Sequence, residues 1–199
     1  MIKSGIFKNP LLLLFALLFA VPAVGATYDI DSSHSSVEFK VKHLAISNVK
    51  GSFNSFSGAF EMEPGQPETW SVEATVDLAS VNTGNEDRDN HLRSADFFNT
   101  EENPTMVFKS TGVKMKDESE GQLMGTLTLN GKTLPVTLDF EFNGTVTDPW
   151  GNDRAGFSAS GTIDRQDWGL SYGDLMEGGG LVIGHDVKIT LEVEGIKKK

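Results

Sequence analysis

Strict alternation of apolar and polar residues runs through most of the chain after residue 26. The clearest row places Leu134, Val136, Leu138 and Phe140 at even positions, with polar residues between most of them. Similar rows cover residues 37–42, 70–78, 123–129, 157–163 and 187–193. Because successive side chains of a β-strand point to opposite faces, this period of two predicts half-buried antiparallel strands.

The dipeptide Asn130-Gly131 separates two of these rows. Asn-Gly is the preferred sequence of a two-residue type I′ turn, which joins adjacent antiparallel strands. Such a turn pairs residue 129 with residue 132 and Leu127 with Leu134, and it places the apolar residues of both strands on one face. The sequence therefore predicts a hairpin in this register.

The apolar row changes phase once, near Asn54-Ser55. Phe53 lies at an odd position and Phe56 at an even one, each with apolar or glycine residues at the same parity. One extra residue here, a β-bulge in a long strand that bends around a barrel, restores a single inward face. Two short strands separated by a turn are the alternative.

Helical segments are few and short. Residues 85–94 begin with acids and end near Arg93, as the helix dipole favours, and we expect a short helix in a crossing loop. Residues 174–177 precede three glycines and would form a single turn. The fold class is therefore all-β, one antiparallel domain of about eight strands, and closure into a barrel would remove its edge strands.

The first 26 residues have the layout of a secretory signal peptide. Lys3 and Lys8 precede an apolar run over residues 11–21, and the segment ends in Val24-Gly25-Ala26. The run is shorter than the roughly 20 residues of a membrane span, so we expect cleavage after Ala26 and no stable membrane anchor. Residues 27–199 then form one domain. Export of a domain without cysteine suggests a Gram-negative periplasm.

Composition excludes several classes of function. The chain has no cysteine, which rules out disulfides, thiol nucleophiles and thiolate metal sites. It carries 28 acidic and 17 basic side chains, with a net charge of −11, which argues against broad contact with nucleic acid or with an anionic membrane surface.

Motifs for catalysis or metal binding are missing from the sequence. The four histidines, at positions 34, 43, 91 and 185, lack the spacing of a metal site. Asp31, His34 and Ser35 are triad residue types, but near neighbours in sequence seldom form a triad. Residues 148–153 are typical of a hairpin loop. We expect no catalytic residue, no metal and no cofactor.

Phenylalanine is abundant, with 13 residues, and most of them lie on or beside the inward rows. A small eight-stranded barrel is either filled by its own side chains or holds one ligand. Composition alone leaves both open, and an apolar cavity would bind an apolar molecule.

Ordered sequence blocks along the whole of residues 27–199 resemble the YceI-like family of polyisoprenoid-binding proteins. The blocks include YDIDSSHSSVEF at 28–39, RDNHLRSADFF at 88–98, GTLTLNG at 125–131 and RQDWGL at 165–170. The resemblance implies a lipocalin-like β-barrel with one or two short helices, located in the periplasm. It also implies a long-chain isoprenoid lipid, such as a polyprenyl chain or an isoprenoid quinone, inside the barrel and no catalytic machinery. Trp168 stands where phenylalanine is more usual in the family.

The resemblance and the inward rows together give candidate ligand-binding residues. The predicted tunnel lining is Phe39, Val41, Phe53, Phe60, Phe97, Phe98, Phe108, Leu127 and Trp168. The predicted head-group contacts are Arg88, His91 and Arg93, which lie in the most polar helical segment. The alternative for both arginines is a structural one, in which they pair with Asp89, Asp96 or Glu101 and hold the crossing loop.

Two other functions remain open at this point. The first is a lipid-acting hydrolase or isomerase that uses His34 or His91 as its base. The second is a solid-cored β-domain that acts through its surface, for example in a stress response. A homodimer is also left open.

Overall fold

The computed structural model describes residues 25–173 and 180–199. The predicted signal peptide, residues 1–26, lies outside the described residues except for its last two, and Ala26 is the first residue of strand β1. The single turn predicted at residues 174–177 also lies outside them. Among the described residues, no helix has the length and apolar character needed to cross a membrane.

Eleven strands and three short helices make up the described chain. The strands are β1 (Ala26–Ile30), β2 (Ser36–His43), β3 (Ser47–Phe53), β4 (Phe56–Met62), β5 (Ser71–Asp77), β6 (Val81–Asn82), β7 (Thr105–Met115), β8 (Glu120–Leu129), β9 (Lys132–Thr147), β10 (Asp153–Asp164) and β11 (Ile183–Lys197). The helices are the α-helix α1 (Glu86–Arg93) and the 3₁₀ turns η1 (Pro67–Thr69) and η2 (Leu78–Ser80).

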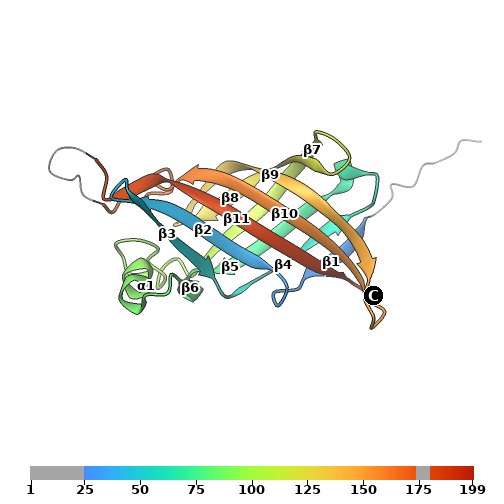
Figure 1. Cartoon of the computed structure of the whole chain (residues 1–199), viewed down its shortest axis with the longest axis horizontal. Helices are drawn as coiled ribbons and strands as arrows, with labels where there is room; N and C mark the ends of the chain where they lie inside the picture. Colours follow the sequence, from blue (N-terminus) through green and yellow to red (C-terminus); the bar gives the residue numbers. More distant parts are fainter. Residues whose placement is uncertain (1–24, 174–179) are drawn as a thin grey trace, which may run out of the picture.

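The strands close into an antiparallel barrel, which confirms the predicted fold class. Strands β1, β4, β5, β7, β8, β9, β10 and β11 form a ring of eight, because β11 also pairs with β1. Strand β2 follows β1 along the same side of β11, with Val37 opposite Leu191 and Ile30 opposite Gly195. Figure 1 shows the long strands β7 to β11 wrapping diagonally around the barrel.

The hairpin at Asn130-Gly131 has the predicted register. Leu129 pairs with Lys132 and Leu127 with Leu134. Both turn residues have positive φ angles, 49° at Asn130 and 71° at Gly131, as a type I′ turn requires. Local turn chemistry and the hydrophobic pattern therefore specify the same pairing.

The predicted bulge at Asn54-Ser55 is instead a break between two strands, so the long-strand interpretation was wrong. Strand β3 pairs with β2 and β6, and β4 pairs with β1 and β5, but the chain does not reverse between them. The backbone at the break bonds to the segment around η2: Asn54 N donates to Ser80 O (3.2 Å), and Asp77 N donates to Ser55 O (2.9 Å). These bonds satisfy the groups that leave the sheet.

Helix α1 covers the residues expected to be helical and lies beside β6 at one end of the barrel (Figure 1). The side chain of Asn85 caps it by accepting a hydrogen bond from Arg88 N (2.9 Å). We call this end the helix end. At the opposite end, which we call the terminal end, β1 begins and β11 finishes.

Two apolar clusters fill the two ends of the barrel. The cluster nearer the helix end contains Phe53, Leu78, Leu129 and Trp168 among its buried residues. The cluster at the terminal end is built on Tyr28, Phe60, Met62 and Ala155. The barrel interior between them is hollow.

Candidate functional site: an apolar cavity inside the barrel

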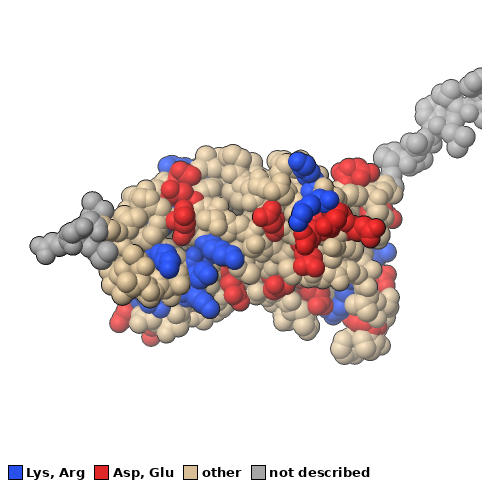
Figure 2. All heavy atoms as spheres, turned by 45° about the horizontal axis from the view of Figure 1, so that its top comes forward, with Lys and Arg blue, Asp and Glu red and all other residues tan. Residues whose placement is uncertain are grey.

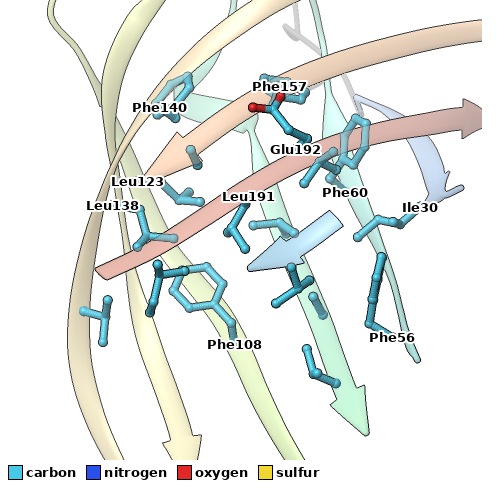
Figure 3. A pocket seen from close by; sticks show the side chains of 18 of the residues that line it. Ile30, Phe56, Phe60, Phe108, Leu123, Leu138, Phe140, Phe157, Leu191 and Glu192 are labelled. Atoms are coloured by element: carbon cyan, nitrogen blue, oxygen red, sulfur yellow. The ribbon is translucent and has the colours of Figure 1, made fainter. Parts of the chain in front are cut away.

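A cavity of about 190 Å³ lies in the barrel interior. Its wall is almost wholly apolar, and Figure 3 shows the side chains that line it. Lining residues come from nearly every strand of the barrel: Ile30, Val37, Phe56, Phe60, Val72, Ala74, Val76, Met106, Phe108, Val113, Leu123, Leu127, Val136, Leu138, Phe140, Phe157, Ala159, Ile189, Leu191 and Val193, with Trp70 just before β5. Such a wall can hold an apolar molecule.

The polar residues on the cavity wall belong to the outward rows of the strands. Glu61, Ser71 and Glu192 are exposed, and Glu192 Oε2 accepts a hydrogen bond from Ser158 Oγ (2.7 Å). In Figure 3 the Glu192 carboxylate is the only oxygen-bearing group among the labelled side chains. Glu192 therefore already has a polar partner on its own surface.

Glycines on other strands of the barrel allow two phenylalanine rings to lie close to its wall. A Cβ atom on Gly125 would lie less than 3.0 Å from the ring of Phe108, and one on Gly195 would be equally close to the ring of Phe60. Only glycine permits this close approach, because it has no side chain. The rings thereby cover backbone and leave the middle of the barrel open.

Aromatic rings close the cavity at the terminal end. The ring centroid of Trp70 lies 5.4 Å from that of Phe142 and 5.6 Å from that of Phe157, both in edge-to-face contact. Trp70 Nε1 donates to Glu63 O (2.8 Å), which fixes the indole orientation. Tyr28 and Phe60 stack with their ring centroids 5.1 Å apart. These contacts make this end a packed aromatic wall.

Trp168 closes the cavity on the side of the helix end. Its side chain is 2% exposed, and Nε1 donates to Leu127 O (3.0 Å) on the neighbouring wall. Asn130 Nδ2 in turn donates to Trp168 O (3.0 Å) and joins this segment to the β8–β9 turn. Trp168 packs with Leu129 and Leu170, so the barrel is filled here.

Arg165, three residues earlier, is buried, and no carboxylate of residues 25–173 or 180–199 forms an ion pair with it. Its guanidinium donates to the carbonyl oxygens of Gly184 (2.9 Å), Ile183 (3.2 Å) and Leu170. Burial lowers the pKa of Arg165 from its ordinary value. The side chain therefore joins the loop after β10 to the start of β11 and holds Leu170 in place.

Three of the nine predicted lining residues, Phe60, Phe108 and Leu127, are on the cavity wall. The other six are not among the residues that line it. Phe39, Phe53, Phe98 and Trp168 pack in the cluster near the helix end. Val41 pairs with Val49 and Val187, and Phe97 packs against His91 and Tyr172 near the surface.

Alternation in the sequence placed several missed lining residues on the correct face. Trp70, Leu138, Phe140 and Phe157 all belong to apolar rows, yet sequence reasoning did not single them out as ligand contacts. A row tells which face is inward but not how far along the barrel each residue lies. That position depends on the tilt and stagger of the strands. These follow from the register of all the strands together in the closed barrel.

The three predicted head-group residues lie on α1 and not on the cavity wall. Arg93 donates to Ala79 O (2.7 Å) and Val81 O (3.0 Å), and Arg88 donates to Thr83 Oγ1 (2.7 Å). Neither arginine makes an ion pair within the part of the chain that the structure describes. The alternative of acidic partners was therefore wrong, although both arginines do hold the crossing loop.

The two histidines considered as bases also lie off the cavity wall. His91 Nε2 is 2.9 Å from Asp96 Oδ2, and its ring packs edge-on against Tyr172. His34 Nδ1 is 2.9 Å from Asp31 Oδ2 in the β1–β2 loop. Ser35, the third triad residue type, bonds the backbone of Glu194 instead of His34. The structure thus does not bring these side chains to the cavity.

Arg154 gathers three carboxylates at the terminal end. Its Nε lies 2.8 Å from Asp148, and its Nη1 lies 2.9 Å from Asp31 and also contacts Glu194. Hydrogen bonds from Ser33, His34 and Arg154 hold the pKa of Asp31 well below its ordinary value. For Asp148, burial alone would raise the pKa, but hydrogen bonds from Arg154 and Asn152 outweigh it, and the pKa is well below the ordinary value.

The model of the YceI-like domain family matches residues 28–195, which is nearly the whole described barrel. The chain belongs to the YceI-like family. A UPF0312 protein of Pectobacterium atrosepticum is 41% identical to this chain over 199 residues, which is 100% of both chains. The match therefore extends over the first 26 residues as well as the barrel.

Solved structures share the YceI-like fold. Burkholderia cenocepacia BcnA superposes with a TM-score of 0.73 at 20% identity, over 83% of this chain and 98% of that one. A polyisoprenoid-binding domain from Saccharophagus degradans, implicated in plant cell wall breakdown, gives a TM-score of 0.60 at 17% identity. That match covers 87% of this chain and 99% of the other. At these identities the likeness establishes the fold.

Proposed function

We propose that this protein binds the chain of a long isoprenoid lipid, such as a polyprenyl chain or an isoprenoid quinone, in the barrel cavity. The observation that carries the proposal is the cavity wall, which is almost wholly apolar. A hydrocarbon chain gains roughly 25 cal/mol for each Å² that it buries there. Membership of the YceI-like family and the polyisoprenoid-binding structural neighbour support this ligand class.

The size of the cavity limits how the chain binds. Its volume of about 190 Å³ is below the roughly 300–1,000 Å³ of most ligand pockets. A long chain therefore needs rotamer changes in the wall, and Met106, with an unbranched flexible side chain, is the most adaptable lining residue. Binding is the activity that the geometry supports, since His34 and His91 do not reach the cavity.

We also propose that the first 26 residues direct export to the periplasm and are removed after Ala26. The protein would then carry or store the lipid there. The length and composition of residues 1–26 support this location. Cell fractionation and sequencing of the N-terminus of the purified protein test it, and a retained Met1 would contradict it.

Native mass spectrometry of protein purified from its own host tests the binding proposal. We expect a mass excess that organic solvent extracts and that tandem mass spectrometry identifies as an isoprenoid. Bare protein that takes up no added isoprenoid would contradict it, and turnover of the bound lipid would instead support the enzymatic alternative.

Two substitutions at adjacent residues of β10 make a matched pair for the same measurement. Ala159 lines the cavity and Ser160 belongs to the outward row of the strand. Ala159→Phe places a ring in the cavity, so we expect at least tenfold less bound lipid. Ser160→Phe adds the same ring outside the barrel and should leave lipid content unchanged. Equal loss in both variants would point to unfolding and not to a filled cavity.

A further inference from the structure

Three lysines lie directly opposite one another on adjacent strands of the outer barrel surface. Lys188 on β11 pairs with Lys40 on β2, and Lys40 pairs with Lys50 on β3. Lys42 follows Lys40 two residues later on the same face of β2. We call these four residues the lysine patch. Figure 2 shows one face of the molecule, on which basic side chains gather in one part and acidic side chains in another.

The lysine patch makes no ion pair within the described part of the chain. None of its four ammonium groups lies within 4.0 Å of a carboxylate among residues 25–173 and 180–199. By contrast, Lys109 lies 3.2 Å from Glu73, and Lys116 lies 2.7 Å from Glu120. Like charges directly opposite on paired strands destabilise a sheet, so fold stability does not explain the patch. It is also unexpected in a chain whose net charge is −11.

An exposed apolar residue projects from the turn between β2 and β3, two of the three strands that carry the patch. Ile46, between β2 and β3, is 85% exposed, the highest value among the large apolar residues of the described chain. Its neighbours Leu44 and Ala45 have φ angles of 51° and 58°, which are unfavourable for residues other than glycine. Leu44 N donates to Val182 O (2.9 Å) and holds this turn against the segment before β11.

We propose that this face docks on an anionic phospholipid bilayer, with the lysine patch over the lipid phosphates and Ile46 at the acyl boundary. Lysines near an anionic membrane surface each add to binding, and an apolar tip beside them inserts below the head groups. The rest of the chain is strongly acidic and is repelled by the same surface. Charge complementarity therefore fixes one orientation of the barrel. Docking by this face requires no particular content of the cavity.

Vesicle flotation tests this proposal with two lipid compositions that have identical acyl chains. One is phosphatidylcholine alone, and the other contains one third phosphatidylglycerol. Because the chains are the same, any uptake of acyl chains into the cavity is equal in both. We expect at least tenfold tighter binding to the anionic vesicles at about 50 mM salt, and most of that difference lost at about 300 mM salt. Binding that is equal on the two compositions would overturn the proposal.

A charge-matched pair of triple variants tests the position of the site. Lys40→Gln, Lys50→Gln and Lys188→Gln together should weaken binding to anionic vesicles at least tenfold. Lys109→Gln, Lys114→Gln and Lys116→Gln remove the same charge from β7 and the turn that follows it, and should weaken it less than threefold. Ile46→Ser alone should weaken binding severalfold.

Two outcomes would contradict this assignment. Equal weakening by the two triple variants would show that only net charge matters. The second outcome is self-association of the wild-type chain without vesicles, lost in the patch variant. Sedimentation velocity would detect it. In that case the lysine patch would bind the acidic face of a second copy. The lipid content of the patch variant, measured after solvent extraction, distinguishes the two proposals. A variant that still contains lipid but no longer binds vesicles has lost membrane docking and not cavity binding.

Discussion

The ring of Phe108 lies across Gly125 on the next strand, so closely that a Cβ atom at residue 125 would be less than 3.0 Å from it. Phe108 itself pairs with Leu127, and its ring reaches diagonally over the glycine. The open space in the barrel thus depends on an aromatic ring held against bare backbone.

Gly125→Ala should push this ring into the cavity and destabilise the barrel. The new methyl group would also meet the backbone oxygen of Lys109, which cannot move freely. We expect a loss of about 1–3 kcal/mol in the free energy of unfolding, measured by urea denaturation. Gly112→Ala on β7 is the control, because its Cβ would meet only the flexible end of Met124 at 3.5 Å. Similar losses of unfolding free energy in both variants would show that the close approach of Phe108 to Gly125 has no special importance.

Trp168→Phe should weaken the packed cluster on the helix-end side of the cavity. The substitution removes the indole N–H that donates to Leu127 O and leaves that buried carbonyl without this partner. We expect a cost of about 1–3 kcal/mol in thermal or urea unfolding. The space released by the smaller ring should also let longer apolar chains bind, as native mass spectrometry would show. An unchanged ligand profile would mean that Trp168 does not limit ligand length.

Arg93→Gln distinguishes a structural role from a head-group role. The guanidinium bonds the carbonyls of Ala79 and Val81, so its loss should cost about 1–3 kcal/mol in the free energy of unfolding. Lipid content should not change, because Arg93 is not on the cavity wall. Loss of lipid at normal stability would restore Arg93 as a ligand contact.

Stability should fall at acidic pH because of the carboxylates around Arg154. The pKa values of Asp31 and Asp148 are lower in the folded protein than the ordinary value near 4. As the pH falls below about 5, the unfolded chain binds protons that the folded barrel does not, so this stabilisation is lost progressively. A plot of melting temperature against pH should be flat near neutrality and drop steeply toward about pH 2.

Arg154→Gln provides the matching test. Removal of the guanidinium leaves Asp31, Asp148 and Glu194 close together without their cation. The melting temperature should fall most at pH 7, where these carboxylates are charged, and the difference from wild type should shrink on acidification. A difference that stays constant with pH would mean that these charges contribute little.

Much of the fold could be predicted because its determinants are local. The alternation at residues 134–142 and the turn at Asn130-Gly131 specify a face and a register without reference to the rest of the chain. The sequence could not decide between a bulge and a break at Asn54-Ser55, because the backbone partners of these residues lie around Ser80. Only the folded barrel brings the segment around Ser80 next to Asn54 and Ser55.

The candidate site was harder to predict than the fold for a similar reason. Phe53 and Phe60 belong to the same face, yet one packs in the filled part of the barrel and the other lines the cavity. Apolar character and alternation are identical for both. What separates them is their height along the barrel axis, which follows from the stagger of all the strands together.

The pairing of β11 with both β1 and β2 has a consequence for the order of folding. Closure joins Tyr28 to Lys197 and Val41 to Val187, so the ring is complete only after the last of the described strands has paired. Contacts this distant in sequence form slowly, and until they form, two unpaired edges are open to other strands. A chain that ends before β11 would have most of the barrel strands but could not close the barrel. We expect such a chain to aggregate, because its edge strands stay unpaired.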